Sequence, residues 1–449
     1  MRGVTAASGL CCLLIAGARP ARGSADDDGL RAADAAQVNL GQQYPISSLT
    51  ELHQVVVTLQ QQPRPASRRH DEEKSRLLGT LDRHAEPWTY NHPRYRLLEA
   101  VHGFLKYHER QAEELARLRG LYKSVTRAQK AFLEHNLSYS SKFDDIDRRL
   151  AANQALCDDI VRTALDFYGV DRHEVQRYVK DAEAKGHAAD KVSVSQALKH
   201  IVRDWTDEGD HERNSTFACL LGTLEELFPQ RDRTEEAVRV LLPGAGLGRL
   251  GFDIHRLGGF QVTINEWSMF MNVVYRFIEA HGQRGAQALH PFVDGWSHHA
   301  TDANMRRRLA FPDVDVDPRS VLMMEGDFTT IFREHEGAYD VVVTYFFIDT
   351  ARNLMAYFDT IKHVLRTGGV WLNLGPLLYG TGPFVQLSLE DIVKVAQAMG
   401  FQFLDTDDRC GPLTFRHATV RSIEGVYGFD KLALTKNSYN AQFWAARKL

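Results

Sequence analysis

Residues 240–250 read Val-Leu-Leu-Pro-Gly-Ala-Gly-Leu-Gly-Arg-Leu, and this stretch decides the fold. A strand rich in valine and leucine runs into a glycine turn, and a helix follows. Glycine permits positive φ and lets a ligand approach the backbone closely. The helix that follows offers free N–H groups and the positive end of its dipole to a ligand. The spacing G-x-G-x-G differs from the G-x-G-x-x-G of nicotinamide enzymes. The alternative to a ligand-binding turn is a tight strand-helix turn that binds no ligand.

Strands and helices alternate from this first strand to the C-terminal end of the sequence. We expect helices at 247–257, 268–281, 351–365 and 389–399, between strands at 237–242, 260–265, 321–324, 339–347, 369–374, 401–405 and 441–446. This alternation predicts an α/β fold with a Rossmann-like, seven-stranded, doubly wound sheet. Residues 284–318 are a polar, proline-bearing insertion in this pattern.

The N-terminal half has a helical pattern instead. Apolar residues recur at steps of three and four within 49–59, 95–123, 143–168 and 194–205, which is typical of helices that bury one face. We therefore predict three regions: a leader or tail at 1–48, an all-helical cap at 49–230, and the Rossmann-like domain at 231–449.

Composition excludes some classes of function. The net charge of −4 favours neither nucleic acid nor a membrane surface. Beyond the N-terminus no stretch of 18 apolar residues predicts a membrane span. The five cysteines include no CxxC pair and no Cys/His cluster, so we predict no metal site. Three cysteines follow residue 12, an odd number, which predicts no disulfide framework and a cytoplasmic or nuclear setting.

The first 25 residues are open to two interpretations. Residues 4–18 are largely apolar and lead to a run of small residues, which resembles a secretory signal with a cleavage site. The alternative is a disordered or misassigned leader. The sequons at Asn136 and Asn214 arise often by chance and do not decide between them.

Acidic residues follow the second, third and fourth predicted strands. Glu266 stands where an acid accepts hydrogen bonds from ribose hydroxyls; a solvated carboxylate at a helix start is the alternative. Asp327 can accept from an adenine amino group while Phe328 covers the ring, or the pair can be an N-cap and a core residue. Asp349 stands where a substrate would meet the ligand, although it can equally cap the next helix. Residues 374–379 form either the rim of this site or a plain turn.

Seven blocks of residues together resemble the carnosine N-methyltransferase family. The resemblance covers roughly residues 90–449, and the family is a class I group that uses S-adenosylmethionine to methylate the imidazole of carnosine (β-alanyl-histidine), giving anserine. The blocks are residues 202–205 (Val-Arg-Asp-Trp), 242–250, 265–268 (Asn-Glu-Trp-Ser), 311–314 (Phe-Pro-Asp-Val), 326–328 (Gly-Asp-Phe), 346–351 (Phe-Phe-Ile-Asp-Thr-Ala) and 373–379 (Asn-Leu-Gly-Pro-Leu-Leu-Tyr).

The resemblance implies roles for particular residues. It makes Asp349 the catalytic and substrate-binding carboxylate, with Tyr379 and Tyr439 as further substrate contacts. Gly380 replaces a histidine that contacts substrate in the family, which leaves the acceptor open. The implied cofactor-binding residues are His200 (in place of a family glutamine), Arg203, Gly244, Gly246, Gly248, Glu266, Asp327, Phe328 and Tyr345.

Several functions stay open at this point. The expected partner is a small histidine dipeptide, and a homodimer is an open alternative to a monomer. A histidine methyltransferase for peptides or proteins would use the same site. A nicotinamide dehydrogenase is disfavoured by the glycine spacing, and a non-catalytic adenosyl-binding protein is disfavoured by Asp349.

Overall fold

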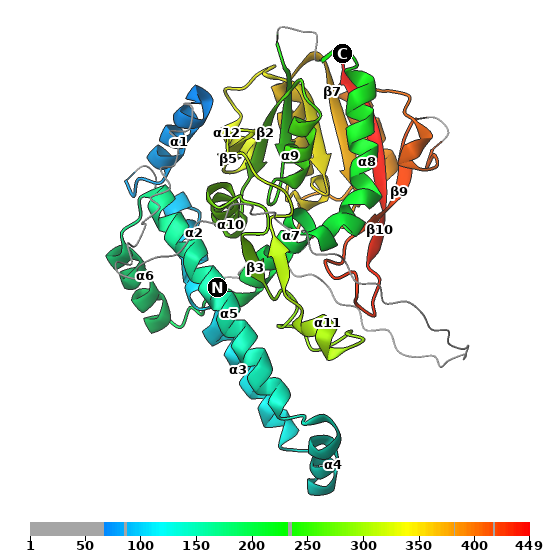
Figure 1. Ribbon diagram of the computed structural model, residues 1–449. Coiled ribbons are helices and arrows are strands. Elements are labelled where there is room, and N and C mark those ends of the chain that lie inside the picture. Colours follow the sequence, from blue (N-terminus) through cyan, green and yellow to red (C-terminus); the bar gives the residue numbers. More distant parts are fainter. Residues whose placement is uncertain (1–66, 85–87, 232–235, 381, 416–417) are drawn as a thin grey trace, which may run out of the picture. The chain divides into compact units, whose positions relative to one another are not determined.

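A mostly parallel sheet forms the centre of the C-terminal half (Figure 1). Its strands follow the order β5-β2-β1-β6-β7-β10-β8, and β9 pairs with β10 outside this path. Neighbours from β5 to β7 are parallel, whereas β10 runs antiparallel to β7, β8 and β9. The strands of this sheet are β1 (Val238–Pro243), β2 (Phe260–Glu266), β5 (Val321–Glu325), β6 (Tyr339–Tyr345), β7 (Leu365–Gly375), β8 (Phe401–Phe403), β9 (Arg421–Val426) and β10 (Ser438–Lys448).

The structure, a computed structural model, describes residues 67–84, 88–231, 236–380, 382–415 and 418–449. The predicted leader and the predicted helix at 49–59 lie outside these residues. Residues 67–449 belong to one compact unit, and the division at residue 230 stays a prediction. No described helix is long and apolar enough to cross a bilayer.

Helices cover both faces of the sheet, as the strand pattern predicts. Successive strand residues point to opposite faces, so Val240 and Leu242 of β1 join one core and Leu241 joins the other. The seven predicted strands are all present, and β9 is an eighth that the pattern did not predict. The helices and turns that connect the strands are α9 (Arg249–Arg256), α10 (Met269–Ala280), α12 (Phe328–Ile331), η3 (Ile348–Thr350), α13 (Leu354–Val364), α14 (Leu389–Ala398) and η4 (Asp408–Cys410).

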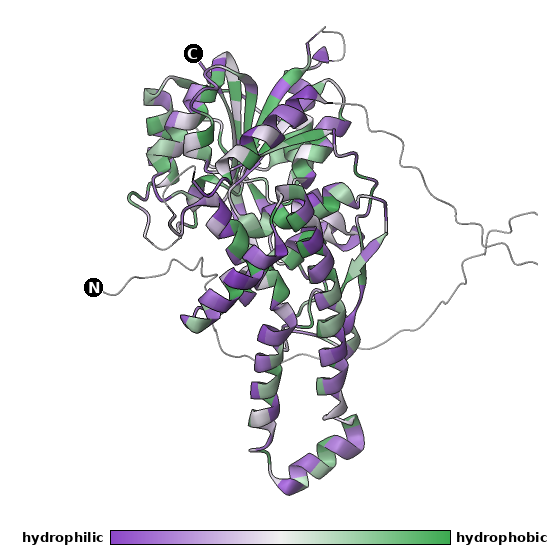
Figure 2. Ribbon diagram, turned by 90° about the vertical axis from the view of Figure 1, so that its left-hand side faces the viewer, coloured by the Kyte–Doolittle hydropathy of each residue, from purple (hydrophilic) through white to green (hydrophobic). Residues whose placement is uncertain are grey.

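The N-terminal half is helical throughout its described residues. Figure 2 shows a long arm of mixed hydropathy, formed by α3 and α5 with α4 across its tip. The helices are α1 (Arg68–Thr80), α2 (Pro93–Leu105), α3 (Tyr107–Tyr122), α4 (Arg127–Leu137), α5 (Ser141–Tyr168), α6 (Arg172–Ala184), α7 (Lys191–Trp205), η1 (Asp207–Gly209) and α8 (Asp210–Leu227).

One predicted helix is wrong. Residues 95–123 form two helices that meet at Lys106, whose φ of −106° and ψ of 13° leave the helical region. The amide side chain of Gln154 on α5 accepts from the His108 N–H at 2.8 Å and donates to the Phe104 carbonyl at 3.2 Å. These bonds satisfy backbone groups that the break exposes. Because Gln154 is distant in sequence, hydrophobic periodicity alone does not reveal the break.

The insertion at 284–318 contains more structure than its polar composition indicates. It holds a two-stranded antiparallel sheet of β3 (Gln287–Leu289) and β4 (Leu309–Phe311), with α11 (Asp302–Arg306) between them. After β4, the carboxylate of Asp313 binds Arg249 at 2.6 Å and Arg213 at 2.9 Å. The insertion is therefore fastened to the helix that follows the glycine turn.

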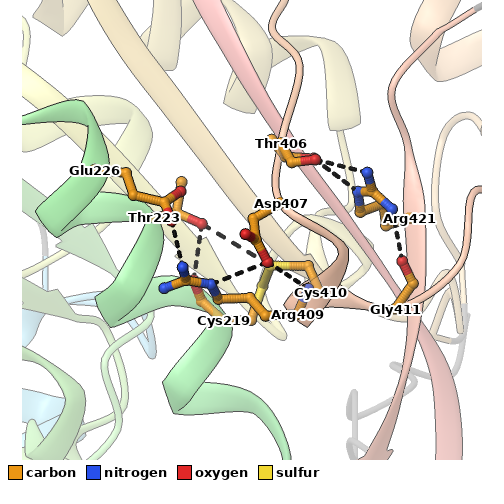
Figure 3. The surroundings of a disulfide bond; sticks show 9 residues. All are labelled: Cys219, Thr223, Glu226, Thr406, Asp407, Arg409, Cys410, Gly411 and Arg421. Carbon is orange, nitrogen blue, oxygen red and sulfur yellow. Dashed lines mark hydrogen bonds and ion pairs between the residues drawn. A yellow bond between two sulfur atoms is a disulfide. The ribbon is translucent and has the colours of Figure 1, made fainter.

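A disulfide joins Cys219 of α8 to Cys410 of η4 (Figure 3). The sequence predicts no disulfide framework, and this one bond corrects that prediction. The pair was not foreseen because 191 residues separate the two cysteines and their odd number gives no sign of a pair. Cys157 is the remaining cysteine among the described residues and is buried. The cysteine count therefore no longer supports a reducing compartment, and the location of the protein stays a prediction.

Candidate functional site

A cavity of about 180 Å³ opens at the carboxyl ends of β1, β2 and β6. Ligands of doubly wound sheets bind at this edge, where the strand order reverses. The lining comes from the cap as well as from the sheet: His200, Arg203, Asp204, Phe217, Leu242, Gly244, Ala245, Gly246, Arg249, Leu250, Glu266, Ser268, Met271, Tyr345, Phe346 and Tyr427.

The glycine turn forms one wall of this cavity. Gly244 and Gly246 have φ of 65° and 58°, a region that favours glycine. A Cβ on Gly244 would lie 2.3 Å from the Phe347 ring, and one on Gly246 would lie 3.2 Å from Arg203 Nη2. Gly248 instead faces Ile264 in the core, at 2.8 Å from a built Cβ. Gly244 and Gly246 therefore line the cavity at positions where a side chain would press on Phe347 or Arg203, while Gly248 packs in the core.

Glu266, at the end of β2, holds the glycine turn in place. Its Oε2 accepts the Gly246 N–H at 2.9 Å, and its Oε1 accepts the Trp267 and Ser268 N–H groups at 2.8 Å. Burial raises the pKa of this carboxyl, while the backbone donors oppose the rise. A carboxylate at this position can also accept the two hydroxyls of a ribose.

Arg203 places a buried positive charge beside the turn. Its Nε donates to Asp204 Oδ1 at 2.7 Å, and Asp204 Oδ2 accepts the Leu247 N–H at 3.2 Å. Burial lowers the pKa of the Arg203 guanidinium, but the Asp204 carboxylate raises it, and the net shift is upward. Burial lowers the pKa of His200 to about 4, so at neutral pH His200 adds no charge. Arg203 is thus positioned to bind a ligand carboxylate.

Asp349 is a buried carboxylate after β6. It is 6% exposed, and its Oδ2 accepts the Leu378 N–H at 2.9 Å. The N-cap of α13 is Asn353, whose side chain accepts from the Ala356 N–H, so the alternative role of Asp349 as a cap is wrong. Burial raises the pKa of Asp349 to about 6. The carboxylate is therefore mostly ionised at neutral pH and remains able to accept a further hydrogen bond.

Three aromatic residues, Phe346, Tyr427 and Tyr439, form what we call the aromatic wall. Phe346 stacks on Tyr427 with ring centroids 5.3 Å apart, and its edge meets Tyr439 at 5.9 Å. Phe346 has a φ of 49°, unusual for an aromatic residue. Residues held in such conformations cluster at functional sites. Beside the wall, the Tyr345 hydroxyl bonds Thr216 of α8 at 3.0 Å.

Other predicted residues lie outside the lining of the cavity. Asp327 caps α12 by accepting the Thr329 N–H at 2.7 Å, and Phe328 packs in the core against Phe347. This is the arrangement of the alternative interpretation, and their adenine contacts stay a prediction. The Tyr379 hydroxyl donates to the Leu387 carbonyl at 2.8 Å. Its ring lies close enough to Asp349 for that charge to add to the upward pKa shift caused by burial.

The lining also contains residues that sequence reasoning did not single out, among them Asp204, Phe217, Phe346 and Tyr427. Asp204 and Phe346 each stand beside a predicted residue inside a quoted block, so the signal was present. Phe217 comes from α8 and Tyr427 from just beyond β9, two elements that the pattern did not predict. Among the described residues no cluster of His, Cys, Asp and Glu could hold a metal ion.

Comparison with known proteins decides the family. A sequence profile described as carnosine N-methyltransferase matches residues 180–449. The chain is 33% identical over 326 residues to the carnosine N-methyltransferase of Schizosaccharomyces pombe, covering 67% of this chain and 81% of that protein. The chain belongs to the carnosine N-methyltransferase family. It is 30% identical to the Mus musculus member over 363 residues, which cover 78% of this chain and 85% of the mouse protein.

As a member of the carnosine N-methyltransferase family, the chain is a methyltransferase, and its sheet is the Rossmann-like one that the sequence predicted. Among solved structures, phosphoethanolamine N-methyltransferase 2 from Haemonchus contortus in complex with S-adenosyl-L-methionine is similar over 50% of this chain and 52% of that chain. The identity is 15% and the TM-score is 0.30.

Proposed function

We propose that this enzyme transfers a methyl group from S-adenosylmethionine to the imidazole Nδ1 of the histidine in carnosine or a related dipeptide, giving anserine from carnosine. Membership of the family supports the reaction class, and the fission yeast and mouse relatives carry the name carnosine N-methyltransferase. The cavity and the buried Asp349 support the two halves of the site.

The residues around the glycine turn suit the methyl donor. The turn offers open backbone at Gly244 and Gly246, Glu266 presents a carboxylate to ribose hydroxyls, and Arg203 presents a cation to the amino acid carboxylate. Bound S-adenosylmethionine supplies an electrophilic methyl group on sulfur. What remains for the protein is to align the acceptor nitrogen with that methyl group and to exclude water.

Asp349 suits the acceptor. Imidazole has a pKa of roughly 6.5, so it is mostly neutral at pH 7 and needs no strong base. If the Asp349 carboxylate accepts the Nε2–H, the tautomer is fixed and Nδ1 keeps its lone pair for the methyl group. The same charge stabilises the imidazolium that develops. The buried carboxylate of Asp349, held after β6 by the Leu378 N–H, is the observation that carries this proposal.

A methyl-transfer assay tests the proposal. Purified protein and S-adenosylmethionine with a labelled methyl group are incubated with carnosine, free histidine or histidine-containing peptides. Product isomers are then separated against authentic standards. Anserine supports the proposal, the Nε2-methyl isomer contradicts the assigned nitrogen, and binding without turnover indicates a non-catalytic adenosyl-binding protein.

A histidine methyltransferase for longer peptides is the second candidate. Gly380 is exposed, and a Cβ built on it meets no atom within 4 Å. Space of this kind near Tyr379 leaves room for an acceptor larger than a dipeptide. Higher kcat/KM on peptides than on carnosine would favour this candidate.

A further inference from the structure

The disulfide lies where α8 meets the loop that leads into β9. Cys219 and Cys410 are both buried, with Cα atoms 5.0 Å apart. Next to Cys410, the Arg409 guanidinium forms ion pairs with Glu226 of α8 and with Asp407. A Cβ on Gly222 of α8 would lie 1.9 Å from Arg409 Nη1, so the end of the arginine side chain lies directly against α8. The contacts in Figure 3 thus seat η4 closely on α8.

The η4 loop is in turn fixed to the first residue of β9. Arg421 donates to the Thr406 carbonyl at 2.6 Å and to the Gly411 carbonyl at 2.9 Å (Figure 3). The Ser422 N–H also donates to the Pro412 carbonyl at 2.9 Å. Because these bonds join the loop to the strand on both sides of Cys410, the position of the disulfide sets the position of the start of β9.

The far end of β9 is fastened to the same helix. Ser215 Oγ accepts the Val426 N–H at 3.3 Å, and the buried Glu212 carboxylate accepts the Gly428 N–H at 2.8 Å. Tyr427 lies between these two contacts. A Cβ on Gly425 would lie 2.9 Å from Phe346 Cζ, and Tyr439 of β10 is paired with Gly425. A shift of β9 along α8 would therefore move Tyr427 relative to Phe346 and Tyr439, and would disrupt the aromatic wall.

We propose that the Cys219–Cys410 disulfide is a positioning element of the acceptor site, which holds the aromatic wall in register by fastening β9 to α8. This inference rests on the proposed function, because that function places the acceptor at the wall. A small-molecule dithiol opens the bond in a balanced exchange: the S–S bond breaks, the dithiol is oxidised to its cyclic disulfide, and each cysteine becomes a thiol. The glycine turn contains no cysteine, so this exchange breaks no bond there.

The test compares oxidised and dithiothreitol-reduced wild type with the double variant Cys219→Ser/Cys410→Ser. Cys157→Ser is the matched control, since Cys157 is buried on α5 and unpaired. Loss of the disulfide should raise the KM for the acceptor about tenfold, and leave the dissociation constant of S-adenosylhomocysteine within about twofold. Reoxidation should restore the original KM. An unchanged KM, or equal losses of acceptor and cofactor binding, would overturn the proposal.

Two further measurements keep the inference separate from folding defects and from the proposed function. Arg421→Gln removes the side-chain hydrogen bonds between the η4 loop and β9 while keeping both cysteines, and it should also raise the acceptor KM. Hydrogen exchange of residues 421–429 should accelerate on reduction while that of residues 244–266 stays unchanged. If wild type methylates no histidine acceptor, the proposed function fails, and exchange alone decides whether the disulfide positions β9. Equal exchange before and after reduction would refute that role.

Discussion

The two sides of the site are built in different ways. The proposed donor side consists of the glycine turn with the side chains of Glu266, at the end of β2, and Arg203, on α7. The proposed acceptor side consists of Asp349 in η3 and the aromatic wall, whose residues follow β6 and β9 or lie on β10. Because these acceptor residues lie on other elements than the donor residues, they can change without disturbing the donor side. Variants should therefore affect one side at a time.

The sharpest test of this separation is Asp349→Asn. Loss of the charge should lower kcat by about 100-fold or more, since a preorganised carboxylate no longer stabilises the imidazolium. Methyl-transfer kinetics measure this loss, and calorimetry with S-adenosylhomocysteine should show unchanged binding. Asn353→Ala is the matched control, because it removes the nearby cap of α13 and leaves Asp349 intact. If Asp349→Asn keeps a kcat close to that of wild type, Asp349 does not stabilise the imidazolium as proposed.

On the donor side, Arg203→Ala should weaken S-adenosylhomocysteine binding by roughly tenfold to 100-fold. The variant loses a hydrogen bond to a charged group, worth roughly 1.5–3 kcal/mol, and leaves Asp204 buried without its partner. Calorimetry measures the change, with Lys199→Ala on the same helix as the control. If the acceptor KM changes more than cofactor affinity does, the proposed division of the site is wrong.

The pH dependence of kcat/KM tests the acceptor side. Both Asp349, whose pKa is raised to about 6, and the acceptor imidazole must be deprotonated for reaction. Below both values kcat/KM should fall about 100-fold per pH unit, because two protons must be lost. In Asp349→Asn only the imidazole titrates, and the slope should fall to about tenfold per unit. A rate profile from pH 5 to 8 checks this, and equal slopes would contradict it.

The smallest expected effect is an increase in the free energy of unfolding of Asp349→Asn. Since the folded pKa of Asp349 is raised to about 6, the native protein binds an extra proton between about pH 4 and 6 relative to the unfolded chain. Stability therefore falls as pH rises through this window, and the loss persists above it. Asp349→Asn should unfold with a free energy higher by roughly 1–2 kcal/mol at pH 7.5, and chemical denaturation should show the gain vanish near pH 4. A variant less stable than wild type at pH 7.5 would show that burial of this charge is not destabilising.

The sequence predicted the donor side better than the acceptor side for a physical reason. The strand, the glycines and the acid within residues 240–266 are predictable because they follow local backbone rules. Asp349 is predictable as a candidate because it closely follows a strongly hydrophobic strand. Tyr427 was missed because β9 has a partly exposed, irregular pattern, and its place depends on contacts with α8. The disulfide and the break at Lys106 were missed likewise, since each depends on a residue far away in the sequence.

The position of β10 has a consequence for how the chain folds. β10 pairs with β7, β8 and β9, while β8 and β9 have no other partner in the sheet of the described residues. Neither can therefore join the sheet before β10 does, so this edge of the sheet should gain protection from proteases as one unit during refolding. Any defect in β10 should release the three strands together.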